Sequence, residues 1–384
     1  MKVVIVGGAG SVGQAVARDL IKYDIFERIV VADILISEER IHESLKSAKK
    51  VSFETMDLYD EEKMVNVLNG ANVVVNCAGP FYKTAIPVVK AAIKVRANYI
   101  DICDDYEATD MLLSSPEIDE SAKSSNITIL TGMGSDPGTN NLLVKRYAQR
   151  LDEVTDVLLY WVVSIAEISG AALDHSLHMV LGKVPQFIDG RLCKVEGGDA
   201  PEMVEFLPPL GTCLVRYVGH PQPLTIPRYL PGVKNVVIKG GLVPSWVDEF
   251  ILKQKEMGLL ERKTVKIGEV FIDTYEFTLH LWDKILESRE KGPKASGLKV
   301  VVRGKRGKSI VQYTASIAGR MAPGTGLPAA IAAIMMAKGK IKEKGVQAPE
   351  GCIEPNEFLS EFIRRGAKIH ESCEEKKVLD IEDL

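Results

Sequence analysis

A glycine-rich loop near the amino terminus constrains the fold more than any other feature of this sequence. The apolar run at 2–6 leads into the segment GAGSVG at 8–13, which is followed by a helical pattern. In this spacing the first glycine permits a tight turn, the second lets the backbone approach a diphosphate, and the third allows close helix packing. The pattern predicts a dinucleotide site formed by Gly8, Gly10, Ser11, Val12 and Gly13, where amides at a helix N-terminus favour the anion.

Short β-rich runs and helical patterns alternate over the first third of the chain. Such alternation predicts a parallel sheet with helices on both faces, the doubly wound α/β class of Rossmann domains. Strands are expected at 2–6, 28–32, 51–55, 72–77, 99–103 and 127–131, and helices near 11–23, 38–48, 61–69, 84–95 and 107–125.

The middle of the chain shows a different pattern of predicted secondary structure. Strand-like runs occur at 154–163, 212–218 and 233–239, and the segment 298–317 reads as a hairpin whose basic turn at 303–308 forms the tip. The stretch 181–232 is rich in Gly and Pro, which favours long surface loops. We therefore expect a second, α+β domain with a mostly antiparallel sheet.

The carboxyl-terminal region predicts two helices. The segment 324–341 is apolar on nearly all sides and ends at Gly339, so it should be buried, and an amphipathic helix follows near 356–365. The charged tail from Glu371 is expected to be a solvated end. These features divide the chain into a dinucleotide-binding domain, 1–135 with 320–384, and a substrate-binding and dimerisation domain, 136–319.

Composition excludes several classes of function. The net charge is only −4, which argues against nucleic acid or an anionic membrane surface as the partner. No apolar stretch approaches the roughly 20 residues that cross a bilayer, and the first residues do not resemble a cleavable signal. The six cysteines are scattered, without metal-ligand spacing. We expect a soluble, cytoplasmic protein with reduced cysteines, no metal, and a small-molecule substrate.

Two further segments should complete the cofactor site. Asp33 follows the second strand, where a carboxylate accepts hydrogen bonds from the ribose hydroxyls and repels a 2′-phosphate, so NAD is favoured over NADP. Asp57, after the third strand, either approaches the adenine or lies free in a surface loop. The loop after the fourth strand should line the cofactor through Cys77, Ala78, Gly79 and Pro80, although Gly79-Pro80 could also be a plain turn.

Together with the glycine loop, several segments resemble the saccharopine dehydrogenase-like oxidoreductases. They are NCAGPFYKTAIPVVKAA (76–92), ANYIDICDD (97–105), GMGSDPGTNNLL (132–143) and the stretch from GTGLPAAIAA to QAPEG. The resemblance implies a Rossmann domain, a second domain that dimerises, and hydride transfer at a carbon–nitrogen centre, as in saccharopine reductases, lysine dehydrogenases and carboxynorspermidine dehydrogenases. Asp33 is more similar to the NAD-using lysine dehydrogenases, whereas Ser135-Asp136-Pro137-Gly138 is nearer the saccharopine pattern.

The resemblance places Asp136 at the substrate ammonium, which a carboxylate would stabilise in a desolvated cleft. Asp136 before Pro137 is also a good helix N-cap, and both roles can coexist. Further candidates for substrate contact are Asn140, with Asn141 beside it, Tyr82, and the arginines Arg216 and Arg228, whose planar groups suit carboxylates. The arginines flank a Pro-rich loop at 218–227; either could instead be a surface charge.

Histidines supply the candidates for proton transfer. His175 and His178 stand three apart, on one face if their segment is helical, and His220 lies in the loop at 218–227. Hydride transfer needs no nucleophile, only a held substrate and one managed proton. His220, His175, or water ordered by Asp136 or Asp101 could serve as general acid or base.

The function predicted is an NAD(P)-dependent oxidoreductase acting on the amine or imine of an amino acid, of the lysine dehydrogenase or saccharopine reductase kind. Two alternatives stay open: a polyamine-pathway dehydrogenase of the carboxynorspermidine type, and a dinucleotide-binding sensor or assembly protein without turnover. A homodimer is the family's implication.

Overall fold

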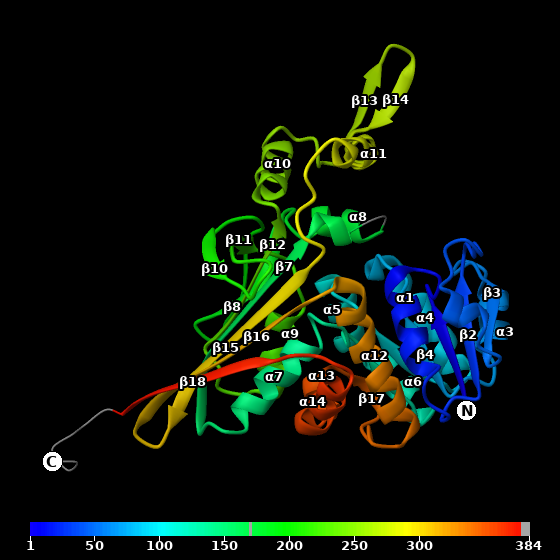
Figure 1. Ribbon diagram of the computed structural model, residues 1–384, viewed down its shortest axis with the longest axis horizontal. Coiled ribbons are helices and arrows are strands. Elements are labelled where there is room, and N and C mark those ends of the chain that lie inside the picture. The colour runs from blue at the N-terminus through cyan, green and yellow to red at the C-terminus, as the bar shows by residue number, and fades with distance from the viewer. Residues whose placement is uncertain (169–170, 378–384) are drawn as a thin grey trace.

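The first sheet is a seven-stranded, all-parallel sheet (Figure 1). The computed structural model describes residues 1–168 and 171–377. The strand order is β17-β6-β5-β4-β1-β2-β3, which is a doubly wound Rossmann order extended by one strand. The strands are β1 (Lys2–Val6), β2 (Arg28–Asp33), β3 (Val51–Thr55), β4 (Val73–Asn76), β5 (Asn98–Asp101), β6 (Thr128–Leu130) and β17 (Gly345–Gln347).

Helices connect these strands largely as the sequence predicts, although only residues 43–46 of the helix expected near 38–48 are helical. They are α1 (Ser11–Leu20), α2 (Glu43–Lys46), α3 (Glu61–Leu68), α4 (Phe81–Lys94), α5 (Tyr106–Leu113) and α6 (Pro116–Ser124). The single helix expected at 107–125 is wrong in one respect. Pro116 begins a second helix there, with the Ser115 side chain accepting from the Ile118 amide, because proline fits the first turn but not a helix interior.

The second sheet has nine strands, in the order β10-β11-β12-β7-β15-β16-β18, with β8 and β9 attached to β12. Only β12 and β7 pair in parallel, so the expected mostly antiparallel sheet is confirmed. The strands are β7 (Glu153–Ser164), β8 (Lys183–Ile188), β9 (Arg191–Glu196), β10 (Glu202–Glu205), β11 (Thr212–Tyr217), β12 (Asn235–Val243), β15 (Ser296–Arg306), β16 (Ser309–Gly319) and β18 (His370–Lys377).

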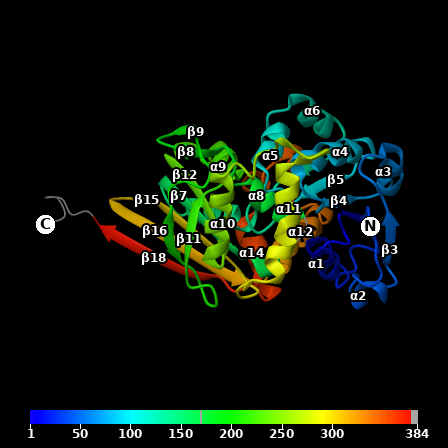
Figure 2. The ribbon, with the colours of Figure 1, turned by 90° about the horizontal axis from the view of Figure 1, so that it is seen from above.

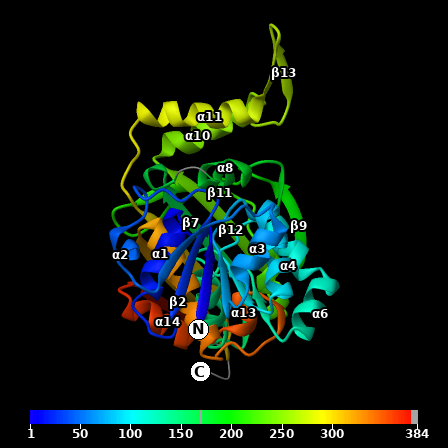
Figure 3. The same ribbon diagram turned by 90° about the vertical axis from the view of Figure 1, so that its right-hand side faces the viewer.

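The other helices lie around this sheet and between the two halves (Figure 2). They are α7 (Thr139–Ala148), α8 (Ala171–His178), α9 (Gln222–Tyr229), α10 (Ser245–Glu256), α11 (Thr274–Glu287), α12 (Met321–Ala337), α13 (Pro349–Cys352) and α14 (Pro355–Arg364). Helix α11 and the hairpin of β13 (Thr264–Ile267) and β14 (Val270–Asp273) project away from both sheets (Figure 3).

The apolar helix α12 returns to the first sheet. A Cβ placed at Gly326 would lie 2.8 Å from the Cβ of Ala15 on α1, so the two helices touch where only a small residue fits. Buried residues of α12 belong to one hydrophobic cluster with those of β1 and β7. This confirms the buried helix, and it packs the two halves against each other.

The structure changes two expectations about irregular segments. The stretch 181–232 contains β8 to β11 and α9 rather than mainly loops. Pro223 lies in the first turn of α9, where proline is tolerated, whereas Pro227 lies inside that helix. The tail is solvated as expected, but it is a strand as far as Lys377, because β18 pairs with β16 of the second sheet. Its residues are all exposed and mostly charged, so no apolar pattern announces this edge strand. The residues from 378 lie outside the described part.

Candidate functional site

The glycine loop turns tightly between β1 and α1. The left-handed residue of this turn is Gly7, with φ +68°, and Gly8 permits the tight turn as predicted, because a Cβ there would lie 2.7 Å from the carbonyl oxygen of Ile5. A Cβ at Gly13 would lie 2.4 Å from the carbonyl oxygen of Gly7, which confirms that Gly13 allows the helix to pack closely. At Gly10 a Cβ would meet only that same oxygen, at 3.3 Å. Helix α1 starts without a side-chain cap, so its first amides can bind an anion.

Asp33 lies at the end of β2, directly beside this loop. Its Oδ2 accepts from the amide of Ala9 at 3.0 Å, and its Oδ1 accepts from the amide of Leu35 at 3.3 Å. The half-exposed carboxylate is thereby oriented next to the diphosphate cradle. Asp57 is exposed and accepts from the amide of Tyr59 at 2.9 Å. Its contact with adenine stays a prediction.

The loop after β4 forms a second wall beside the glycine loop. Cys77, Gly79 and Pro80 line the cleft, and Ala78 lies behind them, where a Cβ at Gly7 would come within 2.7 Å of its amide nitrogen. Burial raises the pKa of the Cys77 thiol to about 12. The protonated thiol is a much weaker nucleophile than the thiolate. Cys77 therefore contributes a small apolar side chain to the wall of the cleft.

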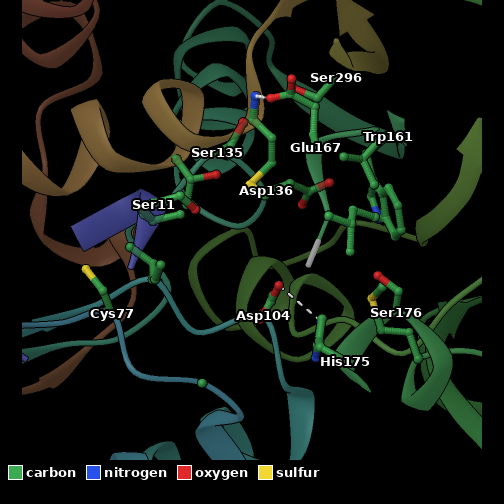
Figure 4. A pocket seen from close by; sticks show the side chains of 18 of the residues that line it. Ser11, Cys77, Asp104, Ser135, Asp136, Trp161, Glu167, His175, Ser176 and Ser296 are labelled. Atoms are coloured by element: carbon green, nitrogen blue, oxygen red, sulfur yellow. Dashed lines mark hydrogen bonds and ion pairs between the residues drawn. The ribbon is translucent and has the colours of Figure 1, made fainter. Parts of the chain in front are cut away.

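A cleft of about 370 Å³ joins this cofactor side to the second domain (Figure 4). Ser11 and Cys77 lie on one side of the view, and Trp161 of β7 lies on the other. Among its described lining residues the polar side chains are carboxylic acids, hydroxyls, imidazoles and an indole, and none is a lysine or arginine. The titratable members besides Cys77 are Asp104, Asp136, Glu167, His175 and His220.

Asp136 lies in this cleft with one carboxylate oxygen held and the other free of hydrogen bonds. Oδ1 accepts from Asn140 Nδ2 at 2.5 Å and from Gln222 Nε2, whereas the buried Oδ2 has no hydrogen-bond partner in the described structure. The side chain is 6% exposed. The N-cap interpretation is wrong: α7 begins at Thr139, and Gly138 is its N-cap. The carboxylate is therefore available to a ligand.

His220 is buried beside Asp136. Its Nδ1 lies 3.7 Å from Asp136 Oδ1, its Nε2 lies 3.2 Å from the sulfur of Met179, and its ring centroid lies 5.5 Å from that of Trp161. The segment 218–227 was expected to be a loop. It is one only up to Pro221, after which α9 begins. The short loop directs His220 into the cleft beside Asp136.

His175 lies between two carboxylates that come from the β5–α5 loop. Its Nε2 is 3.0 Å from Asp104 Oδ2, and its Nδ1 is 2.9 Å from Asp105 Oδ1. Burial alone would lower the pKa of His175, but the two carboxylates together raise it well above its ordinary value. His178 points elsewhere. Its Nε2 lies 3.2 Å from Glu107 Oε1, and its ring packs at a 31° tilt against Tyr82, with centroids 5.2 Å apart.

Several predicted substrate residues lie outside the cleft lining. Arg216 is held by Asp248, with Nε to Oδ2 at 2.8 Å, and Arg228 donates to the carbonyl of Leu113 at 3.4 Å. Asn141 donates to Glu350, which lies beneath α7. The structure thus brings Asp136, Asn140, His175 and His220 together, and it does not bring the two arginines or Tyr82 to them. An arginine clamp for a substrate carboxylate is absent from the described lining.

The sequence interpretation missed Asp104, Trp161 and Glu167. Asp104 could have been found, because it follows β5 at the carboxyl edge of the sheet, where ligands of such folds bind. No sequence pattern pointed to Glu167, because its partner is distant in sequence. Its Oε2 accepts from the amide of Met321 at 3.0 Å, at the start of α12 and 154 residues away. Only the folded chain places these three residues in one cleft.

Asp101 is fully engaged by its own domain. Its Oδ1 accepts from the amides of Cys103 and Gly132 and from Thr131, and its Oδ2 accepts from the Tyr99 hydroxyl. Asp101 therefore orders this turn and does not line the cleft. Burial raises its pKa from 3.8 to about 6, although these hydrogen bonds favour the charged form.

This pKa predicts a pH-dependent contribution to stability. Between pH 3.8 and 6 the folded chain holds a proton on Asp101 that the unfolded chain has lost, so stability from this group falls as pH rises. The unfolding free energy of the wild type minus that of Asp101→Asn should fall by about 3 kcal/mol at most over this window. Urea unfolding at pH 4, 5, 6 and 7 measures it, and a difference independent of pH would contradict the assignment.

Comparison with known proteins identifies the family. The model of the saccharopine dehydrogenase NADP binding domain matches residues 3–130, and that of the saccharopine dehydrogenase C-terminal domain matches residues 199–367. The chain belongs to the saccharopine dehydrogenase-like family. The matched NADP binding domain confirms the expected cofactor class, NAD(P), and the oxidoreductase activity stays a prediction. The preference for NAD, the cytoplasmic location and the homodimer stay predictions.

Individual relatives of this saccharopine dehydrogenase-like chain are distant. A lipid droplet localized protein of Caenorhabditis elegans is 33% identical over 108 residues, which is 26% of this chain and 25% of that protein. A mutant meso-DAP dehydrogenase of Clostridium tetani is 16% identical with a TM-score of 0.44, covering 95% of this chain and 99% of its own. The DAP dehydrogenase of C. glutamicum has 15% identity, the same TM-score and the same coverage. The family assignment rests on the two domain models.

None of the described helices combines the length and the hydropathy that a membrane span requires.

Proposed function

We propose that this protein transfers hydride between NAD(P) and a carbon–nitrogen centre of a small cationic amine or amino acid. The observation that carries the proposal is the position of Asp136. Its buried Oδ2 has no hydrogen-bond partner and lies in the same cleft as the glycine loop. A desolvated carboxylate is stabilised by a charged donor such as an ammonium group. The substrate nitrogen would thus be held within the cleft that receives the cofactor.

The charge of the cleft favours one class of substrate over another. Asp104, Asp136 and Glu167 line it, and the described lining has no lysine or arginine. Asp104 is already paired with His175 and Glu167 with Arg320, which leaves Asp136 as the lining carboxylate with an unbonded oxygen. A dicarboxylic substrate such as saccharopine would bring further negative charge to this wall. A lysine-like or polyamine-like substrate, whose ammonium group can pair with Asp136, fits better. This favours the hypotheses of a lysine dehydrogenase and of a polyamine-pathway dehydrogenase over that of a saccharopine reductase.

The chain's own residues would bind and orient the substrate and manage one proton. NAD(P), when bound by residues of the glycine loop and Asp33, accepts or supplies the hydride. Asn140 and Gln222 fix the orientation of the Asp136 carboxylate, so that its free oxygen addresses the amine. His220, 3.7 Å from Asp136, would receive the proton that leaves the nitrogen during amine oxidation. Trp161 would exclude water from that side.

Initial rates of NADH and NADPH formation test this proposal. We expect turnover with lysine or with a linear polyamine, and a kcat/KM at least about 10-fold lower with saccharopine, because one unpaired buried charge costs more than 1.4 kcal/mol. Faster turnover of saccharopine would contradict the substrate class. Tight NAD(H) binding without turnover of any amine, amino acid or keto acid would favour the sensor function instead.

A further inference from the structure

Three potential metal ligands converge at the second-domain end of the cleft. Asp104 comes from the β5–α5 loop, His175 from α8 and His220 from the loop before α9. One ligand atom from each lies within 4.8 Å of the other two. Figure 4 shows Asp104 and His175 facing each other at the cleft. Three elements remote in sequence therefore place an N₂O donor set around one point.

The two histidines of this cluster are buried, and one ring nitrogen has no hydrogen-bond partner. His175 is 9% exposed and His220 is 3% exposed. His175 Nε2 lies 3.0 Å from Asp104 Oδ2 and its Nδ1 lies 2.9 Å from Asp105 Oδ1, whereas the Nδ1 of His220 has no hydrogen-bond partner in the described structure. Burying such a group unpaired costs about 1–3 kcal/mol. A cation shared with Asp104 and His175 would satisfy the free nitrogen of His220.

A carboxylate also stands where a metal-binding histidine needs one. A metal-binding histidine uses one ring nitrogen for the metal. Its other ring nitrogen usually donates to a carboxylate, which orients the ring. Asp105 Oδ1 lies 2.9 Å from His175 Nδ1, on the side away from Asp104. Asp105 Oδ2 in turn accepts from the amides of Phe81 and Tyr82 at 2.6 and 3.2 Å. His175 Nε2 is thus directed toward Asp104 by a partner that is itself fixed.

We propose that Asp104, His175 and His220 bind one divalent transition-metal ion of the Zn²⁺ class. Two imidazoles and one carboxylate are a donor set that suits zinc, and three protein ligands leave a fourth position open. That position would face the cleft near Asp136, where a substrate nitrogen or oxygen could occupy it. The sequence predicted no metal because positions 104, 175 and 220 follow no motif spacing. The inference stands on the cluster itself and does not require hydride transfer to be correct. With the ion bound, His220 would be a ligand, and the substrate proton would pass to water ordered by Asp136 instead of to His220.

Metal content and a cobalt spectrum test the site. The full chain is stripped with a chelator, reloaded with Zn²⁺ or Co²⁺, desalted, and analysed for metal by mass spectrometry. We expect one ion per chain and, with Co²⁺, the intense visible absorption of four-coordinate cobalt. His175→Gln and His220→Gln should each lower Zn²⁺ affinity at least about 100-fold. His280→Gln is the matched control, because His280 is exposed on α11 and belongs to neither described group of potential metal ligands.

The outcomes separate this inference from the proposed function. NAD(P)H binding monitors folding of each variant, and Asp104→Asn provides a third ligand variant if a histidine variant fails to fold. Wild-type protein that retains no Zn²⁺ or Co²⁺ overturns the metal site, and so does equal retention by the ligand variants. If chelated enzyme then turns over amines at the full rate, the proposed function stands while the metal site fails. Stoichiometric metal without amine turnover would support the site and contradict the function.

Discussion

Replacing Asp33 with serine is expected to reverse the nucleotide preference of this enzyme. Asp33 Oδ2 accepts from the Ala9 amide at 3.0 Å, which holds the carboxylate where ribose hydroxyls bind. A hydrogen bond to a charged group contributes about 1.5–3 kcal/mol, so NADH affinity should fall about 10- to 100-fold. NADPH affinity should rise, because the charge that repels the 2′-phosphate is gone. Fluorescence titrations with NADH and NADPH measure both dissociation constants.

Asp24→Ser is the control for this exchange. Asp24 is an exposed carboxylate in the loop before β2, at the opposite edge of the same sheet. The same substitution there should leave both dissociation constants unchanged. Tighter binding of NADPH than of NADH by the wild type would show that Asp33 does not select NAD.

The second large effect is expected from Asp136→Asn. Leaving a buried ammonium without its carboxylate costs about 3–5 kcal/mol, so kcat/KM for an amine substrate should fall at least about 100-fold. The variant retains an acceptor oxygen for Asn140 and Gln222, and the glycine loop is unaltered, so NADH affinity should not change. Steady-state rates and NADH titration on the same preparation separate the two effects.

Asp189→Asn controls for loss of an acidic residue in the second domain. Asp189 is exposed in the β8–β9 turn, with φ +49°, a conformation that asparagine also adopts. Its kcat/KM should equal that of the wild type. If Asp136→Asn turns over amines normally, the substrate nitrogen is bound elsewhere.

The sequence predicted the strand, turn and helix around the glycine loop well because that geometry is local. The glycine loop and Asp33 are set by one strand, one turn and the end of the next strand, and the residue spacing carries this geometry. The positions of Asp136 and His220 were also named, the first through family resemblance. Asp136 and His220 lie close together because of the positions of α9 and the second sheet. No short sequence pattern predicts those positions.

The errors have identifiable physical causes. Arg216 has the chemistry expected of a carboxylate clamp, but Asp248 of α10 pairs with it at 2.8 Å. Prolines made α9 read as a loop although one of them occupies its first turn. Strand β18 has no alternating apolar pattern and pairs along its length with β16. In each case a partner distant in sequence decided the outcome, and single-sequence patterns do not contain that partner.

The path of the chain also affects the order in which its parts can be completed during synthesis. Strand β17 and helix α12 belong to the first sheet and its covering layer, yet the ribosome makes them after the whole second sheet except β18. Until about residue 347 has emerged, the nucleotide-binding half lacks its last strand and exposes the face of α1 that Gly326 later covers. During synthesis, the amino-terminal half therefore exposes apolar surface to solvent until the final quarter of the chain has been made.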